Sequence, residues 1–583
     1  MAYAGKDDWG VMRKRLILSA ACAALSFPAS AAADGGPIMP LSQVQAGMDC
    51  TADTVVQGTT ISSFDVHVIN VVEQGGEGAR ILVSVSGPAV TPSGIAEGFS
   101  GSPVYCPGPG GVPENIGAIS EKIGQFGNNK GLVTPIQEML GEPVTPPSSA
   151  PRLALRAQPL SGPLMVTGLA PPLLSVLKRA GERAGRTFDA APAAPALDFP
   201  VQPLVPGASV ATSYSTGTIG IGAIGTVTYR DGNTVYAFGH PLDDAGRRSL
   251  PLQDAYVYDV INNPSAGGGG SYKLAAPGHT VGTLTSDTPN AVIGRVGAAP
   301  RMIPVNVAAR DLDTHKTITE DTQVADESDI GNPLGSSMLS IVAPIAVGEA
   351  ATDVFDGAPA NQSGTMCLRV RLRERDMLLK FCNRYTGTGG GDGFGGSVPA
   401  LSAGATSDAA SAISLIDQVK FATLHVVRVA ASITARPGLD VASILSARAP
   451  RVVRAGSRVK VRLRVQLYRG RIRTLTFGLE IPHGLRGPQV AILNGGGGSG
   501  SDTAALLQAL LGPLLGGGAG GGPPASLAAL KAAFAAVPGY DGLRVAFAKQ
   551  KPRHAFRDPK LLITGSAPLT FDVKGHQRPT TPK

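Results

Sequence analysis

Aromatic residues are scarce in this chain: Phe, Trp and Tyr make up 5% of its 583 residues, with a single Trp. Aromatic platforms and zinc-ligand spacings are missing, and no block of basic residues dominates although the net charge is +8. We therefore expect no nucleic-acid-binding module. Cys-x-x-Cys pairs are also absent, which makes a zinc site the poorer explanation of the cysteines. The sequence gives no reason to expect a metal or an organic cofactor.

Turn-forming residues, by contrast, are abundant. The chain contains 76 Gly and 47 Pro, and 43% of its residues are hydrophobic. Small residues and turn formers at this level favour a mainly β architecture with long loops over a helical bundle. The length allows roughly two to four domains.

The N-terminus has the three parts of a secretory signal. A basic stretch at residues 12–15 precedes an apolar stretch at residues 16–27, and Ala29-Ser30-Ala31 has the small-x-small form of a cleavage site. Residues 1–33 are therefore predicted to be a signal peptide cleaved near Ala31, and the mature protein to be secreted or associated with the cell envelope. An uncleaved anchor is the alternative, although the apolar run is short for a membrane span.

The cysteines agree with export. Removal of Cys22 with the signal leaves four, an even number that predicts disulfides in an exported chain. Cys367 and Cys382 bracket two alternating strands, and a hairpin there places them opposite each other. Cys50 and Cys106 then pair by elimination, and this bridge would brace the loop just before Cys106.

Changes of composition divide the rest of the chain. A Pro/Ala-rich stretch and a Gly/Ser/Ala-rich stretch predict linkers between strand-rich units. Strands are expected at residues 338–347, in the histidine-bearing unit, and at residues 419–433, in the C-terminal β-rich module. The predicted units are residues 34–140, a serine-bearing β-barrel unit; 141–206, a linker with a short helix at 173–184; 207–386, a histidine-bearing β-barrel unit; 387–411, a flexible linker; and 412–583, a β-rich module.

The first string with candidate chemistry is GFSGSP, residues Gly98–Pro103. Ser100 lies on a tight turn between glycines, which permit backbone angles that bulkier residues resist. Such a turn can direct the N–H groups of Gly98 and Ser100 at one point and form an oxyanion hole. Ser102 is the rival nucleophile but fits the G-x-S-G pattern less well, and a purely structural turn is the simpler alternative.

The second string is FGHP, residues Phe238–Pro241, in which His240 follows an apolar strand. A histidine at a strand end with a satisfied ring is the simpler explanation. A serine and a histidine brought together, however, form the nucleophile and general base of an acyl-transfer enzyme. His67 alternates with valines and is expected to face solvent.

These strings resemble the SpoIVB-type serine peptidase family, named for stage IV sporulation protein B. That family carries a G-x-S-G-S-P string, a following G-A-I/V strand and a T-P-I-x-x-M-L close, found here at residues 98–103, 117–119 and 134–140. The resemblance is dense over residues 43–140 and resumes at residues 225–242. It implies a trypsin-like double β-barrel and serine endopeptidase activity, with Ser100 as nucleophile and His240 as base.

The chain departs from the family in two ways. The histidine segment follows the serine segment instead of preceding it, so the barrels would be permuted. The family aspartate precedes the serine loop, where this chain reads ILVSVSGPAV and has no carboxylate. Asp287 is the favoured third residue, because it lies a few strands after His240. Asp243, Asp244 and Asp65 are alternatives, as is a Ser–His dyad.

The predicted function is thus an exported serine endopeptidase that acts on a protein or peptide substrate. The alternative is a non-catalytic secreted or cell-surface binding protein that keeps the peptidase scaffold. Two strands carry alternating basic residues, which indicate either a solvated sheet face or contact with anionic cell-envelope polymers or lipid headgroups. These residues are Lys460, Arg462 and Arg464, and Arg369, Arg371 and Arg373.

Overall fold

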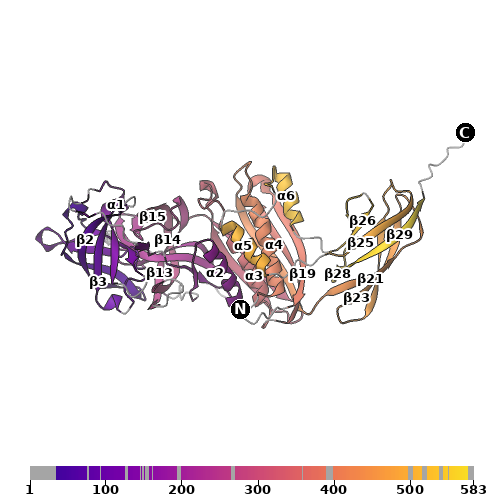
Figure 1. The fold of residues 1–583 in the computed structure, drawn as a ribbon, viewed down its shortest axis with the longest axis horizontal. Coiled ribbons are helices and arrows are strands. Elements are labelled where there is room, and N and C mark those ends of the chain that lie inside the picture. The colour runs from indigo at the N-terminus through magenta and orange to yellow at the C-terminus, as the bar shows by residue number, and fades with distance from the viewer. Residues whose placement is uncertain are drawn as a thin grey trace, which may run out of the picture.

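The protein is described here by a computed structural model with 51% strand and 18% helix, which confirms the expected mainly β class. It describes residues 35–574 apart from 75–77, 92, 125–128, 145, 147–149, 152–156, 161, 193–198, 264–269, 358, 389–397, 497–502, 515–521, 538–541 and 549. The predicted signal peptide, residues 1–33, lies outside the described residues. The molecule is elongated, with strands β2 and β3 at one end and the C-terminal module at the other (Figure 1).

The first six strands close into a β-barrel. Its ring runs β4-β1-β2-β3-β6-β5, and β5 pairs back with β4. Strand alternation fills the interior: Phe64, Val66 and Val68 of β2 are buried, while Asp65 and His67 between them are exposed, as expected for His67. The strands are β1 (Asp49–Gln57), β2 (Thr60–Gln74), β3 (Gly78–Ser86), β4 (Pro103–Pro107), β5 (Pro113–Ile123) and β6 (Lys130–Pro135).

Six later strands form a second closed ring of pairings, β10-β13-β14-β15-β12-β11, with β11 pairing back on β10. The turn expected at Asp231-Gly232-Asn233 joins β11 to β12, with Asp231 opposite Thr234. Gly232 has a φ of 54°, which this hairpin turn favours. The strands are β10 (Ser209–Gly217), β11 (Gly220–Asp231), β12 (Thr234–Ala237), β13 (Gly246–Ile261), β14 (Tyr272–Thr288) and β15 (Ala291–Val296).

The segment between the rings contributes to both sheets. Helix α1 (Ile136–Leu140) ends the first barrel, and β7 (Ala157–Pro159) pairs with the edge of β5. Strands β8 (Leu164–Thr167) and β9 (Phe188–Ala190) extend the second sheet beyond β11. Helix α2 (Pro171–Arg183) lies between them and confirms the short helix expected there.

Five strands carry the second sheet onward from β10, and four helices pack beside them (Figure 1). These five strands, the central sheet, pair antiparallel except where β20 runs parallel to β16. The strands are β16 (Met302–Asp311), β17 (Thr317–Ala325), β18 (Asn361–Leu372), β19 (Leu378–Thr388) and β20 (Val426–Pro437). The helices are α3 (Leu339–Asp353), α4 (Ala400–Asp417), α5 (Thr503–Leu514) and α6 (Leu527–Ala536).

Three sequence predictions are wrong in this central part. Residues 339–347 belong to helix α3 instead of a strand, because an apolar run buried on all sides has no periodicity that distinguishes a helix from a strand. Residues 400–411 of the predicted linker belong to the buried helix α4, and residues 389–397 lie outside the described part. The small residues of α4 serve close packing: Ser402 Oγ donates to the Gly348 carbonyl of α3 at 2.7 Å. Strand β20 belongs to the central sheet instead of the last module.

The last module is a pair of β-sheets around its own apolar core. The basic residues 460, 462 and 464 of β23 are exposed, while residues 461, 463 and 465 between and after them are buried, as the alternation predicts. One sheet has the order β24-β23-β21-β28 and the other β22-β29-β25-β26-β27. The strands are β21 (Val441–Arg448), β22 (Val452–Arg454), β23 (Arg458–Leu467), β24 (Ile472–Glu480), β25 (Gly487–Asn494), β26 (Leu543–Phe547), β27 (Arg553–Phe556), β28 (Leu562–Thr564) and β29 (Ser566–Lys574).

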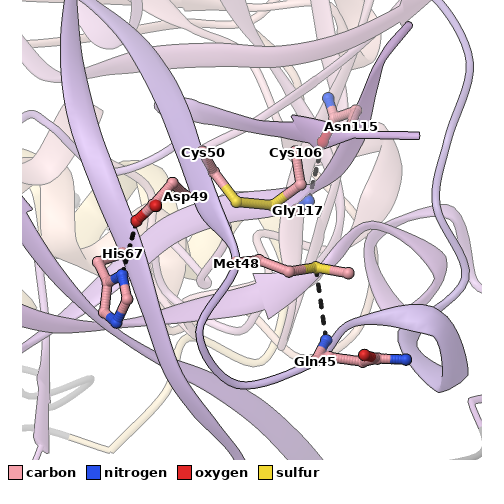
Figure 2. Close-up of a disulfide and its surroundings, with 8 residues drawn as sticks. All are labelled: Gln45, Met48, Asp49, Cys50, His67, Cys106, Asn115 and Gly117. Atoms are coloured by element: carbon pink, nitrogen blue, oxygen red, sulfur yellow. Dashed lines mark hydrogen bonds and ion pairs between the residues drawn. A yellow bond between two sulfur atoms is a disulfide. The ribbon is translucent and has the colours of Figure 1, made fainter. Parts of the chain in front are cut away.

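Both predicted disulfides are present. Cys367 and Cys382 face each other across β18 and β19. Cys50 of β1 is bonded to Cys106 of β4, three residues after the serine string (Figure 2). Two such bonds indicate an oxidising compartment. Among the described helices, none has the length and apolar character needed to cross a bilayer.

Loss of the Cys50–Cys106 bond should destabilise the protein more than loss of the other bond. It closes a loop of 56 residues against 15 for Cys367–Cys382, and a longer loop loses more chain entropy when it is closed. We expect Cys50→Ala/Cys106→Ala to lower the free energy of unfolding by about 2–5 kcal/mol. Urea unfolding of both double variants measures this. An equal or smaller loss for the first pair would contradict the expectation.

Candidate active site

The serine string forms a tight turn between β3 and β4. Gly98 and Gly101 have φ values of 88° and 90°, a region in which side chains are strained. A side chain at Gly101 would also collide with the Thr226 carbonyl of the second ring. The turn is tied to β11 of that ring, because Thr226 N–H donates to the Ser100 carbonyl at 2.8 Å and Thr228 Oγ1 to the Gly101 carbonyl at 2.8 Å.

The two serines of the turn have different surroundings. Ser102 Oγ donates to the Phe99 carbonyl at 2.6 Å and is fully occupied in holding the turn. Ser100 Oγ is buried, and among the described residues it has no hydrogen-bond partner. A buried hydroxyl without a partner is costly, and a reacting group is one reason to keep it. Ser100 is therefore the better candidate nucleophile.

The turn also fixes the orientation of the Gly98 and Ser100 N–H groups, the two donors predicted for an oxyanion hole. In a trans peptide the N–H points opposite to the C=O. The Phe99 carbonyl accepts from Ser102 N–H at 2.9 Å, and the Glu97 carbonyl from Lys273 N–H at 2.9 Å. These bonds fix the directions of the Ser100 and Gly98 N–H groups. Neither N–H has an acceptor within the described part of the chain.

His240 is positioned by contacts from both rings. It follows β12 through Phe238 and Gly239, both with a φ of 70°. Positive φ at a phenylalanine is strained and is retained only where the surroundings enforce it. Thr134 of the first barrel donates through Oγ1 to the Gly239 carbonyl at 2.7 Å. The histidine loop is thus held against the barrel that carries Ser100.

The ring of His240 has a defined tautomer. Its Nδ1 lies 2.7 Å from the carbonyl oxygen of Pro241, which can only accept, so Nδ1 carries the proton of the neutral ring. Nε2 is then the basic nitrogen. Burial lowers the pKa of His240 from 6.5 to about 4, and the carbonyls of Pro241 and Leu160 oppose this shift. The ring is therefore neutral at pH 7.

Ser100 and His240 line the same cavity, which has a volume of about 310 Å³. The wall also contains apolar side chains, Leu164 and Ile224 among them, and the charged pair Arg186–Asp243. The serine comes from the first barrel and the histidine from the second ring, so the cavity lies where the two meet. His240 also borders a second cavity of about 560 Å³.

Asp287 lies near His240 but does not contact its ring directly. Its carboxylate is fully buried and accepts from the backbone N–H groups of Leu242 at 2.7 Å, Asp243 at 2.8 Å and Ala245 at 3.2 Å. The Leu242 N–H belongs to the same peptide group as the Pro241 carbonyl that binds Nδ1. Asp287 is thus connected to the His240 ring through one peptide group, in place of the direct contact that the sequence predicted. Burial raises its pKa, and the backbone N–H groups oppose this.

A buried ion network behind this loop was missed by the sequence analysis. Asp243 pairs with Arg186 at 2.6 Å and with Arg248 at 2.5 Å, and Tyr214 Oη donates to it at 2.5 Å. Arg248 is fully buried and also holds Glu327 through two bonds of 2.9 and 3.0 Å. These residues come from segments far apart in the chain, and no local spacing in the sequence signals their meeting.

The remaining candidates lie away from the cavity. Asp65 is exposed on the outer face of β2, and Asp244 is exposed in the loop after His240. His67 pairs with Asp49 on the barrel surface at 2.7 Å (Figure 2). Within the described ranges, no cluster of His, Cys, Asp and Glu is arranged to hold a metal ion.

The comparisons with known proteins give no match: no family model, no curated protein and no solved structure is significantly similar to this chain.

Proposed function

We propose that the chain is an exported serine endopeptidase of SpoIVB type, built on a permuted trypsin-like pair of barrels. The observation that carries the proposal is the shared cavity: Ser100 and the neutral His240 line it from two different rings, and the Ser100 hydroxyl has no hydrogen-bond partner among the described residues. Beside them, the N–H groups of Gly98 and Ser100 have no acceptor among the described residues. These are the parts that acyl transfer needs.

In the proposed reaction, Ser100 Oγ attacks the carbonyl carbon of a peptide bond while His240 Nε2 takes its proton. The oxyanion of the tetrahedral intermediate accepts hydrogen bonds from Gly98 and Ser100 N–H. The C–N bond then breaks, and His240 protonates the departing amine. Water, activated by the same ring, hydrolyses the resulting acyl-enzyme and restores Ser100.

The Pro241 carbonyl takes over part of the role of the usual carboxylate. It orients the ring and selects the tautomer. It has no full negative charge, so it stabilises the imidazolium less than an aspartate in direct contact would. This feature also favours the second candidate function, a binding protein that keeps the scaffold without turnover.

The low pKa of His240 gives a distinctive test of the enzyme. The base is neutral above its pKa, so on the acid side of the pH profile kcat/KM for a fluorogenic peptide should stay constant down to about pH 5 and decline below it. An enzyme whose catalytic histidine had the ordinary pKa of 6.5 would instead lose activity below about pH 6.5. His240→Ala should lower activity by about 10⁴-fold to 10⁶-fold, and His67→Ala, an exposed control, should not.

Hydrolysis by wild type that survives His240→Ala would contradict the proposal. A correctly folded wild type without hydrolysis of any peptide in a mixed-sequence library would favour the binding protein. Circular dichroism and the urea midpoint establish that each variant is folded.

A further inference from the structure

A buried lysine lies beneath the serine turn. Lys273 of β14 is 1% exposed. Its Nζ donates to Thr54 Oγ1 at 2.8 Å and to Thr226 Oγ1 at 3.1 Å, and it lies 5.1 Å from the centre of the Phe99 ring. No described acidic side chain forms an ion pair with it. A buried ammonium group in such surroundings is costly, so its position calls for a reason.

Lys273 contacts the turn through its backbone and its stem. Its N–H donates to the Glu97 carbonyl at 2.9 Å, and Glu97 N–H donates in return to the Ser271 carbonyl at 2.7 Å. The Glu97 carbonyl belongs to the peptide group whose N–H is that of Gly98. The aliphatic stem fills the space below Gly98, where an added Cβ would lie 3.1 Å from Lys273 Cβ.

The ammonium group reaches the turn through a threonine. Because Lys273 Nζ can only donate, Thr226 Oγ1 accepts from it and directs its own proton elsewhere. That proton goes to the Gly98 carbonyl, 3.2 Å away. The N–H of the same threonine holds the Ser100 carbonyl at 2.8 Å. Thr226, held by Lys273, therefore fixes the peptide groups that contain the Gly98 and Ser100 carbonyls. These two groups lie directly before and after the peptide group that carries the Ser100 N–H.

We propose that Lys273 is a positioning residue of the oxyanion hole, and that its positive charge, relayed through Thr226, keeps the Gly98 peptide groups in the orientation that receives the oxyanion. The inference rests on the proposed peptidase function. Lys273 is not the general base, because it donates to two threonines and does not line the cavity that Ser100 shares with His240.

The charge of Lys273 is expected to change near neutral pH. Burial lowers its pKa from 10.5 to about 7. The carboxylates on the surrounding elements are engaged elsewhere or exposed: Glu97 pairs with Lys122 at 2.8 Å, Asp53 accepts from Ser63 at 2.6 Å, and Asp259 is exposed. Tyr272, next to Lys273 in β14, is half-buried. Activity should therefore fall as the pH rises through about 7, whereas a plain Ser–His site holds its activity there.

The test compares Lys273→Met with wild type in peptide hydrolysis between pH 5 and pH 9. At pH 6 we expect kcat to fall about tenfold or more with KM changed less than about threefold. The ratio of wild-type to variant activity should shrink above pH 7, where the wild-type lysine is neutral. The variant should also be more stable than wild type at pH 6, with a higher Tm, because it no longer buries a charge.

Two threonine variants provide a matched pair that leaves the lysine in place. Thr226→Val removes the contact with the Gly98 carbonyl, and Thr54→Val removes only a hydroxyl that does not touch the turn. We expect the larger loss of kcat for Thr226→Val. This pair and the wild-type pH profile decide the matter even if Lys273→Met does not fold.

Parallel pH profiles for wild type and Lys273→Met, or equal losses for the two threonine variants, would overturn the positioning role while leaving a Ser100-dependent peptidase intact. Hydrolysis that is absent at every pH, or that survives Ser100→Ala, would instead overturn the proposed function, and the role of Lys273 with it.

Discussion

Replacing Ser100 by alanine should reduce peptide hydrolysis by about 10⁴-fold to 10⁶-fold, the loss that removal of a catalytic serine produces. The reason is local: Ser100 carries the hydroxyl on the cavity shared with His240, and among the described residues that hydroxyl has no structural bond to lose. The fold should therefore be unaffected, with an unchanged urea midpoint.

Ser102→Ala is the matched control for this substitution. Its hydroxyl holds the Phe99 carbonyl, so its loss should loosen the turn and lower kcat without removing the nucleophile. The reverse result, an inactive Ser102→Ala and an active Ser100→Ala, would show that Ser102 is the nucleophile and Ser100 is not.

Asp287→Asn should lower kcat by about 10²-fold. The carboxylate accepts three backbone N–H groups of the loop after His240, including the N–H of the peptide group that binds Nδ1. An amide keeps only one acceptor oxygen, so its NH2 group faces either the Leu242 N–H or the N–H groups of Asp243 and Ala245, and the loop is displaced. Displacement of the ring by about 1 Å is enough for a loss of this size.

Asp65→Asn and Asp244→Asn are controls for Asp287, because both carboxylates are exposed and outside the cavity. Neither should change kcat/KM measurably. Full activity of folded Asp287→Asn would show that the His240 loop holds its position without the carboxylate, and a Ser–His dyad would then suffice.

Local patterns in the sequence were enough to predict the features that depend on neighbouring residues. The glycines around Ser100 predict the turn, Asp231-Gly232-Asn233 predicts the hairpin before His240, and the alternation around Cys367 predicts its disulfide. Each depends on backbone geometry that a few adjacent residues decide.

The missed features depend on contacts between residues far apart in the chain. Lys273 meets Thr54 and Thr226 across both rings, and a lysine in an otherwise ordinary strand gives no sign of burial. The partner of His240 is a backbone carbonyl, which every residue possesses, so no motif can identify it. The failure at α3 has another cause, since a helix buried on all sides has no polar face to reveal its period.

The central claim is that Ser100 is an activated nucleophile, and covalent labelling with a fluorophosphonate tests it most directly. We expect the folded wild-type protein to take up one phosphonyl group, which mass spectrometry of its peptides places on Ser100. Labelling should disappear in Ser100→Ala and be strongly slowed in His240→Ala. Folded wild-type protein that takes up no label, or takes it up equally after Ser100→Ala, would contradict the peptidase assignment and favour a binding protein.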